Sequence, residues 1–173
     1  METISRLTAD RLTWLALEFA RMNRARSEGY FQSCLASQER GELVALVTRA
    51  EEDLLGFVKV LWTSDYAPFK EQMIPEINDL LVTPPNRRRG VASRLMDEAE
   101  KIIRTRSSVV GIGVGLHPGY AAAQRMYVLR GYVPDGSPLT YRNEFVREGQ
   151  EVCLDDDLVM YLTKEFKPSG SGA

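Results

Sequence analysis

The sequence predicts an α/β fold, because strand-like and helix-like segments follow one another along its 173 residues. The clearest unit spans residues 76–103, where an apolar run leads directly into three arginines, a glycine and an amphipathic helix. A second observation is a pair of apolar runs, 42–48 and 54–62, separated by a short acidic turn, which predicts two antiparallel neighbouring strands. Residues 1–166 suit a single domain, long enough to bury a core without metal or disulfide staples.

The remaining elements follow in chain order. Residues 2–7 predict a short first strand. A helix follows, capped within 8–10 and carrying apolar residues at helical spacing, and a second helix spans 28–37. We expect a loop at 66–69, a strand at 76–82, and a helix from 91 to about 107. A glycine-interrupted strand at 109–116, a helix within 121–131 and a last strand at 158–163 complete the series.

The arginine-rich turn predicts a phosphate site. A helix N-terminus presents unpaired N–H groups and a positive dipole end, and Gly90 lets an anion approach the bare backbone. The spacing excludes a nucleoside-triphosphate loop and a dinucleotide loop, which need more glycines at fixed offsets. The same residues would also suit a basic, solvated helix start at which Gly90 only relaxes the turn.

Two motifs carry a family resemblance. Arg87, Gly90 and Ala92 fill the pattern Gln/Arg-x-x-Gly-x-Gly/Ala, which resembles the pyrophosphate-binding signature of the GNAT (GCN5-related N-acetyltransferase) superfamily. Residues 121–132 resemble its second hallmark, a helix bearing a tyrosine, here Tyr127, four residues before a glycine–aromatic pair. The resemblance covers 76–132 by these motifs and the rest of the chain by element order.

The resemblance implies a mixed, mostly antiparallel sheet with helices on both faces. A splayed opening between the fourth and fifth strands would admit the pantetheine of acetyl-CoA. It implies an acetyl-CoA-dependent N-acetyltransferase, an acyltransferase in which a primary amine attacks the thioester directly in a ternary complex, so neither cysteine need be a nucleophile. The alternative is a non-catalytic CoA-binding sensor or regulatory domain, against which the presence of both Tyr127 and Glu76 argues.

The resemblance also implies the residues that hold acetyl-CoA. Backbone N–H groups from Arg87 to Ala92 would cradle the pyrophosphate, and the N–H of Val82 would polarise the thioester carbonyl. Arg88 and Arg89 could instead point toward solvent or the ribose phosphate. Tyr120 stands where many members have an asparagine that contacts the pantetheine, so this contact is in doubt. The full predicted set is Leu81, Val82, Arg87, Arg88, Arg89, Gly90, Val91, Ala92, Ser93, Tyr120 and Gln124.

Two residues are expected to manage protons. Tyr127 matches the family's general acid, which protonates the departing thiolate. Glu76 lies eleven residues before Arg87, the separation of the catalytic glutamate in the histone acetyltransferase branch, although in other branches the base is water. Strand alternation predicts that Asp79 points to the opposite face from Glu76.

The acceptor is expected to be a small cationic amine. Tyr30, Asp79, Asp156 and Asp157 are its predicted contacts, because carboxylates near a cleft attract ammonium groups. Three adjacent acids at 155–157 would also suit a solvated turn without a binding role, and Tyr30 would also suit a position in the hydrophobic core. His117, the only histidine, ends the fifth predicted strand, either near the reacting centre or as an ordinary loop residue.

Composition restricts the remaining possibilities. The net charge of −2 gives no global basic field, so no nucleic-acid partner is expected. Cys34 and Cys153 are too few for a disulfide framework, and no cluster has metal-ligand spacing, so we expect no metal and a cytoplasmic location. No apolar run approaches the roughly 20 residues of a membrane span, and residues 167–173 read as a flexible tail, natural or left by cloning. A homodimer is possible.

Overall fold

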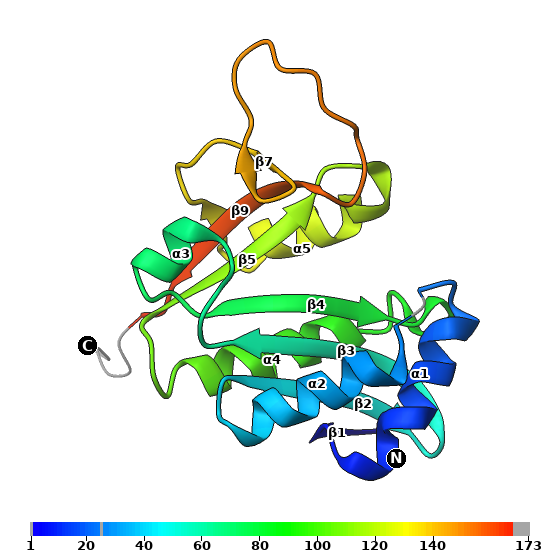
Figure 1. The fold of residues 1–173 in the computed structure, drawn as a ribbon. Helices are drawn as coiled ribbons and strands as arrows, with labels where there is room; N and C mark the ends of the chain where they lie inside the picture. The colour runs from blue at the N-terminus through cyan, green and yellow to red at the C-terminus, as the bar shows by residue number, and fades with distance from the viewer. Residues whose placement is uncertain (1, 25, 168–173) are drawn as a thin grey trace.

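The computed structural model describes residues 2–24 and 26–167. Its strands form one mixed sheet in the order β1-β2-β3-β4-β5-β9-β7-β8, with β6 also paired to β9 (Figure 1). Every neighbouring pair in the described residues is antiparallel except β4 and β5. The strands are β1 (Glu2–Arg6), β2 (Leu43–Ala50), β3 (Asp53–Leu61), β4 (Glu76–Val82), β5 (Val109–Gly115), β6 (Val133–Pro134), β7 (Thr140–Tyr141), β8 (Glu144–Phe145) and β9 (Leu158–Glu165).

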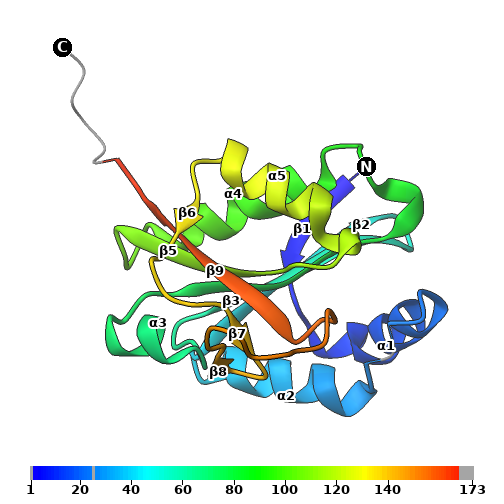
Figure 2. The same ribbon diagram turned by 90° about the horizontal axis from the view of Figure 1, so that it is seen from above.

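Helices cover both faces of this sheet. Seen from above, α1 and α2 lie on one face while α4 and α5 lie on the other (Figure 2). The helices are α1 (Leu12–Arg21), α2 (Glu28–Glu39), α3 (Ala67–Glu71), α4 (Val91–Ile103) and α5 (Ala121–Leu129). The prediction of a mixed, mostly antiparallel sheet with helices on both faces is therefore confirmed. No helix in the described ranges is long and apolar enough to cross a bilayer.

Several boundaries differ from the sequence-based expectation. Where a loop is expected at 66–69, the short helix α3 forms instead; it begins at Ala67, has Pro68 in its first turn and buries Phe69. Gly111 of β5 allows this burial, since a Cβ there would lie 2.1 Å from the Phe69 ring. Helix α4 ends at Ile103, short of residue 107. The expected tail lies outside the described residues, apart from Lys167.

The two faces of the sheet carry separate cores. The sequence spacing predicts one apolar face of α4 with Val91, Leu95, Ala99, Ile102 and Ile103. On one face of the sheet, α4 buries four of these against β2, β3 and β4, while Ile102 is only partly buried. On the other face, Phe19 of α1, Phe31 of α2 and Phe57 of β3 meet edge to face, with ring centroids 5.1 to 5.8 Å apart. Each face of the sheet therefore has its own packed core.

The sheet opens between β4 and β5. These parallel strands pair only at Glu76↔Gly111 and Ile77↔Ile112, and beyond these residues they diverge (Figure 1). The predicted splay between the fourth and fifth strands is confirmed. It leaves the C-terminal halves of both strands with free backbone edges that face one another.

Candidate active site

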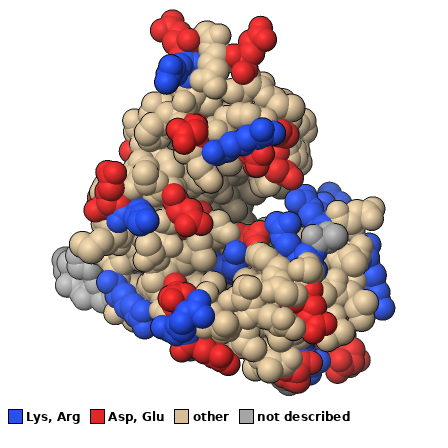
Figure 3. All heavy atoms as spheres, in the orientation of Figure 1, with Lys and Arg blue, Asp and Glu red and all other residues tan. Residues whose placement is uncertain are grey.

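The cleft between the diverging strands holds most of the residues predicted for the site. Its volume is about 830 Å³, and Figure 3 shows it as a hollow with both basic and acidic atoms around its mouth. The predicted residues that line it are Glu76, Asp79, Leu81, Val82, Arg87, Arg88, Gly90, Val91, Ala92, Ser93, Tyr120, Tyr127, Asp156 and Asp157. Arg89, Gln124 and Tyr30 do not line it.

One end of the cleft is the turn that leads into α4. Gly90 is the N-cap of this helix and has φ +80°, a left-handed conformation that favours glycine. No side chain caps the helix here, so the N–H groups of its first turn are available to an anion. Arg87 reaches back along the cleft, with its Nε 3.4 Å from the Val82 carbonyl oxygen. The geometry suits a pyrophosphate.

Two predicted contacts point elsewhere. Arg89 donates to the Asn86 side chain at 3.0 Å and lines a separate hollow on the far side of the turn. Gln124 donates its Nε2 to the Gly115 carbonyl at 2.8 Å, which ties α5 to the end of β5. Motif spacing does not reveal either placement.

One backbone N–H group of β4 faces the opening at the end of the strand. Thr83 donates its N–H to Leu55 of β3 at 3.0 Å, and in an antiparallel pair successive residues alternate between facing the partner and facing away. Alternation therefore turns the N–H of Val82, the residue predicted for carbonyl polarisation, toward β5.

Tyr127 stands on the α5 wall of the cleft. Its side chain is buried and lines the cleft. Burial, and secondarily the neighbouring Tyr120, raises the pKa of Tyr127. The phenol therefore keeps its proton over the physiological range, as a group that donates a proton must.

Tyr120 forms the outer part of the same wall. Its ring lies on Gly115, where a Cβ would approach it to 2.4 Å, and its hydroxyl donates to Asp156 at 3.1 Å. His117 Nε2 lies 2.8 Å from the same Asp156 oxygen, and His117 Nδ1 accepts the Gly119 N–H at 3.0 Å. His117 thus donates through Nε2 and orients Asp156 without entering the cleft. These bonds, that from His117 first, lower the pKa of Asp156.

Glu76 lies at the closed base of the cleft, where β4 pairs with β5. It is buried, and its carboxylate accepts hydrogen bonds from the Ser64 hydroxyl and, at 2.9 Å, from Asn78. Burial raises the pKa of Glu76 despite these two bonds. A carboxylate with a raised pKa is suited to accepting a proton near neutral pH.

The expectation that Asp79 faces away from Glu76 is wrong. Phe57 pairs with Leu81, and Lys59 pairs with Asn78. These two pairs are two positions apart on β3 but three positions apart on β4, so β4 contains one extra residue, a bulge. Asp79 lies in this bulge with φ +55°. The bulge breaks the two-residue alternation and turns Asp79 to the face of Asn78 and Glu76, toward α2. Both carboxylates therefore line one cleft.

Asp79 is held by a cluster that the sequence did not indicate. Its carboxylate accepts the Tyr30 hydroxyl and lies 3.4 Å from Lys59 Nζ and 3.6 Å from Arg26 Nη2. Burial opposes ionisation, but Lys59, Tyr30 and Arg26 outweigh it and lower the pKa of Asp79. Tyr30 thus holds the Asp79 carboxylate in place and does not itself line the cleft. A lone lysine inside the apolar β3 run was the available signal for Lys59.

The acidic run after the β7–β8 hairpin reaches the outer mouth of the cleft. Asp157 lies 3.4 Å from Arg142 Nε, and Asp155 accepts the Tyr141 hydroxyl at 3.2 Å. Asp156 and Asp157 line the cleft, whereas Asp155 caps the turn and does not. Only part of the run therefore faces the predicted acceptor side.

Comparison with known proteins places this geometry in a family. The family model described as "Acetyltransferase (GNAT) family" matches residues 9–132. A comparison with the curated proteins finds no match.

Solved structures share the fold at low identity. A ribosomal-protein-alanine N-acetyltransferase from Brucella melitensis aligns with TM-score 0.69 and 16% identity over 95% of this chain and 99% of its own. An N-acetyltransferase from Staphylococcus aureus aligns with TM-score 0.71 and 12% identity over 96% and 99%. A Vibrio cholerae spermidine N-acetyltransferase, in complex with CoA and spermine, gives 0.62 and 14% over 95% of each chain. Because the family model spans well over half of the residues, the chain belongs to the acetyltransferase (GNAT) family.

Proposed function

We propose that this acetyltransferase transfers the acetyl group of acetyl-CoA to the primary amine of a small cationic acceptor, by direct attack in a ternary complex. The observation that carries the proposal is the cleft between β4 and β5. It joins the uncapped, glycine-started turn of α4 to Tyr127 and Glu76 in one space. The first turn of α4 would hold the pyrophosphate, and Arg87 would add a charge-assisted contact.

The carbonyl oxygen of the thioester would be stabilised by backbone N–H groups on the open edge of β4. Val82 faces this edge, and Leu80, in the adjoining bulge, would be a second donor; each donor of this kind typically contributes about 10²- to 10³-fold in rate. Leu80 lies nearer to Glu76, four residues away, or about 13 Å along an extended strand. Glu76 would thus receive the ammonium proton through intervening water.

Proton transfer completes the reaction. The ammonium loses one proton toward Glu76 and the amine nitrogen forms a bond to the acetyl carbon. As the carbon–sulfur bond breaks, Tyr127 donates its proton to the thiolate, and the second proton of the nitrogen returns to the Tyr127 phenolate as the amide forms. Burial raises the pKa of Glu76, so its carboxylate binds a proton more tightly than an exposed one, and burial also raises the pKa of Tyr127, so the phenol holds a proton to donate.

Asp156 and Asp79 support a cationic acceptor in different ways. Asp156 is ionised, oriented by His117 and Tyr120, and has the exposure to meet an incoming ammonium group. Asp79 already pairs with Lys59 and Arg26, so its charge is largely compensated. The Vibrio neighbour that holds spermine shows only that this fold accommodates such an amine.

Acetyl-CoA turnover against a panel of polyamines, aminoglycosides and peptides tests the proposal. We expect thiol release that depends on one class of cationic amine and yields the acetylated amine by mass spectrometry. Tight CoA binding by calorimetry with no amine-dependent turnover would instead support a CoA-binding sensor.

A further inference from the structure

A buried carboxylate outside the cleft links the two halves of the molecule. Glu100 lies on α4, nine residues after Val91, and is 5% exposed. One carboxylate oxygen accepts Arg130 Nε at 3.1 Å and the Tyr132 hydroxyl at 3.1 Å. The other accepts Lys164 Nζ at 2.8 Å. No step proposed above uses this group.

The partners of Glu100 come from the far side of the cleft. Helix α4 packs on β2, β3 and β4, whereas Arg130 and Tyr132 follow α5 and Lys164 belongs to β9. Between these halves the sheet has only the two paired positions at the base of the opening. Apolar packing also joins them, but it is non-directional, while three groups that meet at one carboxylate define a distance and an orientation.

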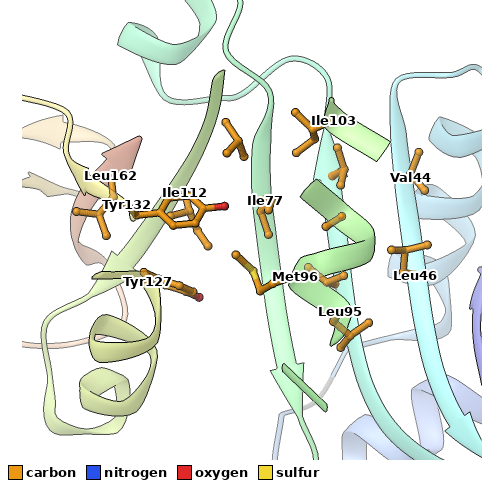
Figure 4. Packing of buried hydrophobic residues seen from close by; sticks show 14 of the residues in the cluster. Val44, Leu46, Ile77, Leu95, Met96, Ile103, Ile112, Tyr127, Tyr132 and Leu162 are labelled. Atoms are coloured by element: carbon orange, nitrogen blue, oxygen red, sulfur yellow. The ribbon is translucent and has the colours of Figure 1, made fainter. Parts of the chain in front are cut away.

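Tyr132 connects this carboxylate to Tyr127. Gly131 has φ +87° and ends α5, so the Tyr132 N–H donates to the Tyr127 carbonyl at 3.0 Å. The two rings are 5.9 Å apart, and in Figure 4 both hydroxyls point toward the side on which Ile77 and Met96 lie. Tyr132 is thus fixed at its side chain by Glu100 and at its backbone by Tyr127.

We infer that Glu100 is a positioning residue for the transfer step: it sets the placement of Tyr127 relative to the α4 turn that would hold acetyl-CoA. This inference rests on the proposed function of Tyr127 as the acid. A helix that carries the thioester and a helix that carries the proton donor must keep a fixed separation, because misplacement by about 1 Å can cost on the order of 10²-fold in rate. Glu100 makes the buried ionic contacts that join them, whereas the Asp97–Arg130 pair lies at the surface.

A double-mutant cycle tests whether Glu100 acts through Tyr127. The change Glu100→Gln keeps the size of the side chain but removes the charge and presents an amide to Lys164. We expect kcat to fall about tenfold in otherwise wild-type protein and by less than twofold in the Tyr127→Phe background, with the Kd of CoA unchanged in both. A merely structural role would lower kcat by the same factor in both backgrounds, and that result would overturn the inference.

Two further variants control for folding. Asp97→Asn removes another partner of Arg130, at 2.6 Å on the surface, and should leave kcat and the cycle unchanged. Tyr132→Phe removes one hydroxyl without leaving a buried charge unpaired. It should lower kcat in the same way as is expected for Glu100→Gln, and it takes the place of Glu100→Gln in the cycle if Glu100→Gln does not fold.

A titration separates this inference from the proposed function. In protein labelled with ¹³Cζ-tyrosine, the NMR signal of Tyr127 reports the pKa of its hydroxyl. Glu100→Gln and Tyr132→Phe should each move this pKa toward the ordinary value of a tyrosine. Asp97→Asn should leave it unchanged. If no amine is acetylated, or if Tyr127→Phe keeps full turnover, the proposed function fails and this titration still decides the positioning. An unchanged Tyr127 titration in both variants would refute it.

Discussion

Replacement of Gly90 gives the most direct test of the phosphate-binding turn. At φ +80° an L-residue costs about 1–2 kcal/mol, and a β-branched residue is the least tolerated there. A Cβ at this position would also lie 2.9 Å from the Arg94 guanidinium, a flexible group that can move. The variant Gly90→Val should therefore fold with reduced stability, and its first turn should relax away from the left-handed start.

The expected loss of CoA affinity follows from the N–H groups that this turn presents. A hydrogen bond to a charged group contributes about 1.5–3 kcal/mol, so losing one or two such bonds should weaken binding by roughly 10²-fold. Isothermal titration calorimetry with CoA measures this directly.

Gly149 provides a matched control, because it has φ +76° and no atom within 4 Å of a Cβ built there. Gly149→Val should show a similar loss in melting temperature and an unchanged Kd. If folded Gly90→Val binds CoA as tightly as wild type, the turn does not hold the pyrophosphate.

Three other substitutions test the chemistry and the acceptor. Tyr127→Phe should lower kcat by about 10²-fold in steady-state assays and keep the Kd of acetyl-CoA, and unchanged kcat with chemistry rate-limiting would exclude Tyr127 as the acid. In the wild type, kcat should fall at low pH with a midpoint above 4.5, the ordinary pKa of a glutamate, because the base works only when it is ionised. Glu76→Gln should abolish this fall. At pH values above this midpoint, the same change should raise the melting temperature, because a carboxylate whose pKa is raised by folding destabilises the folded state when it is ionised. Equal melting curves of the two proteins at pH 7 would contradict this reasoning. Replacing Asp156 and Asp157 together by Asn should raise the acceptor KM and leave the acetyl-CoA KM alone, and an acceptor KM indifferent both to this change and to ionic strength would remove the charge argument.

The fold could be predicted from the sequence because local patterns and architecture agree in most segments. The stripe of α4, the paired runs of β2 and β3, and the glycine-rich β5 each encode their own element. What could not be predicted were contacts that depend on where the chain turns. Arg89 leaves the cleft because of the geometry of one turn, and α3 forms because Phe69 finds the space above Gly111.

Residues from distant segments were the other limit of sequence reasoning. Lys59 and Arg26 meet Asp79 only because β3, β4 and the segment before α2 come together in the fold. Glu100 reads in the sequence as an ordinary charged residue of an amphipathic helix. Its three partners lie at least 30 residues away along the chain.

The bulge in β4 shows how one extra residue changes the chemistry of a site. With strict alternation, Asp79 would lie on the face of α4, away from Glu76, and would bring an uncompensated charge into an apolar core. The left-handed conformation of Asp79 is one that aspartate tolerates better than most residues. It returns the carboxylate to the face where Tyr30, Lys59 and Arg26 can pair with it. Because the bulge also follows directly after the positions that pair β4 with β5, it lies where the strands begin to separate. The same irregularity therefore turns a second carboxylate toward the cleft at the point where the edge of β4 becomes free of β5.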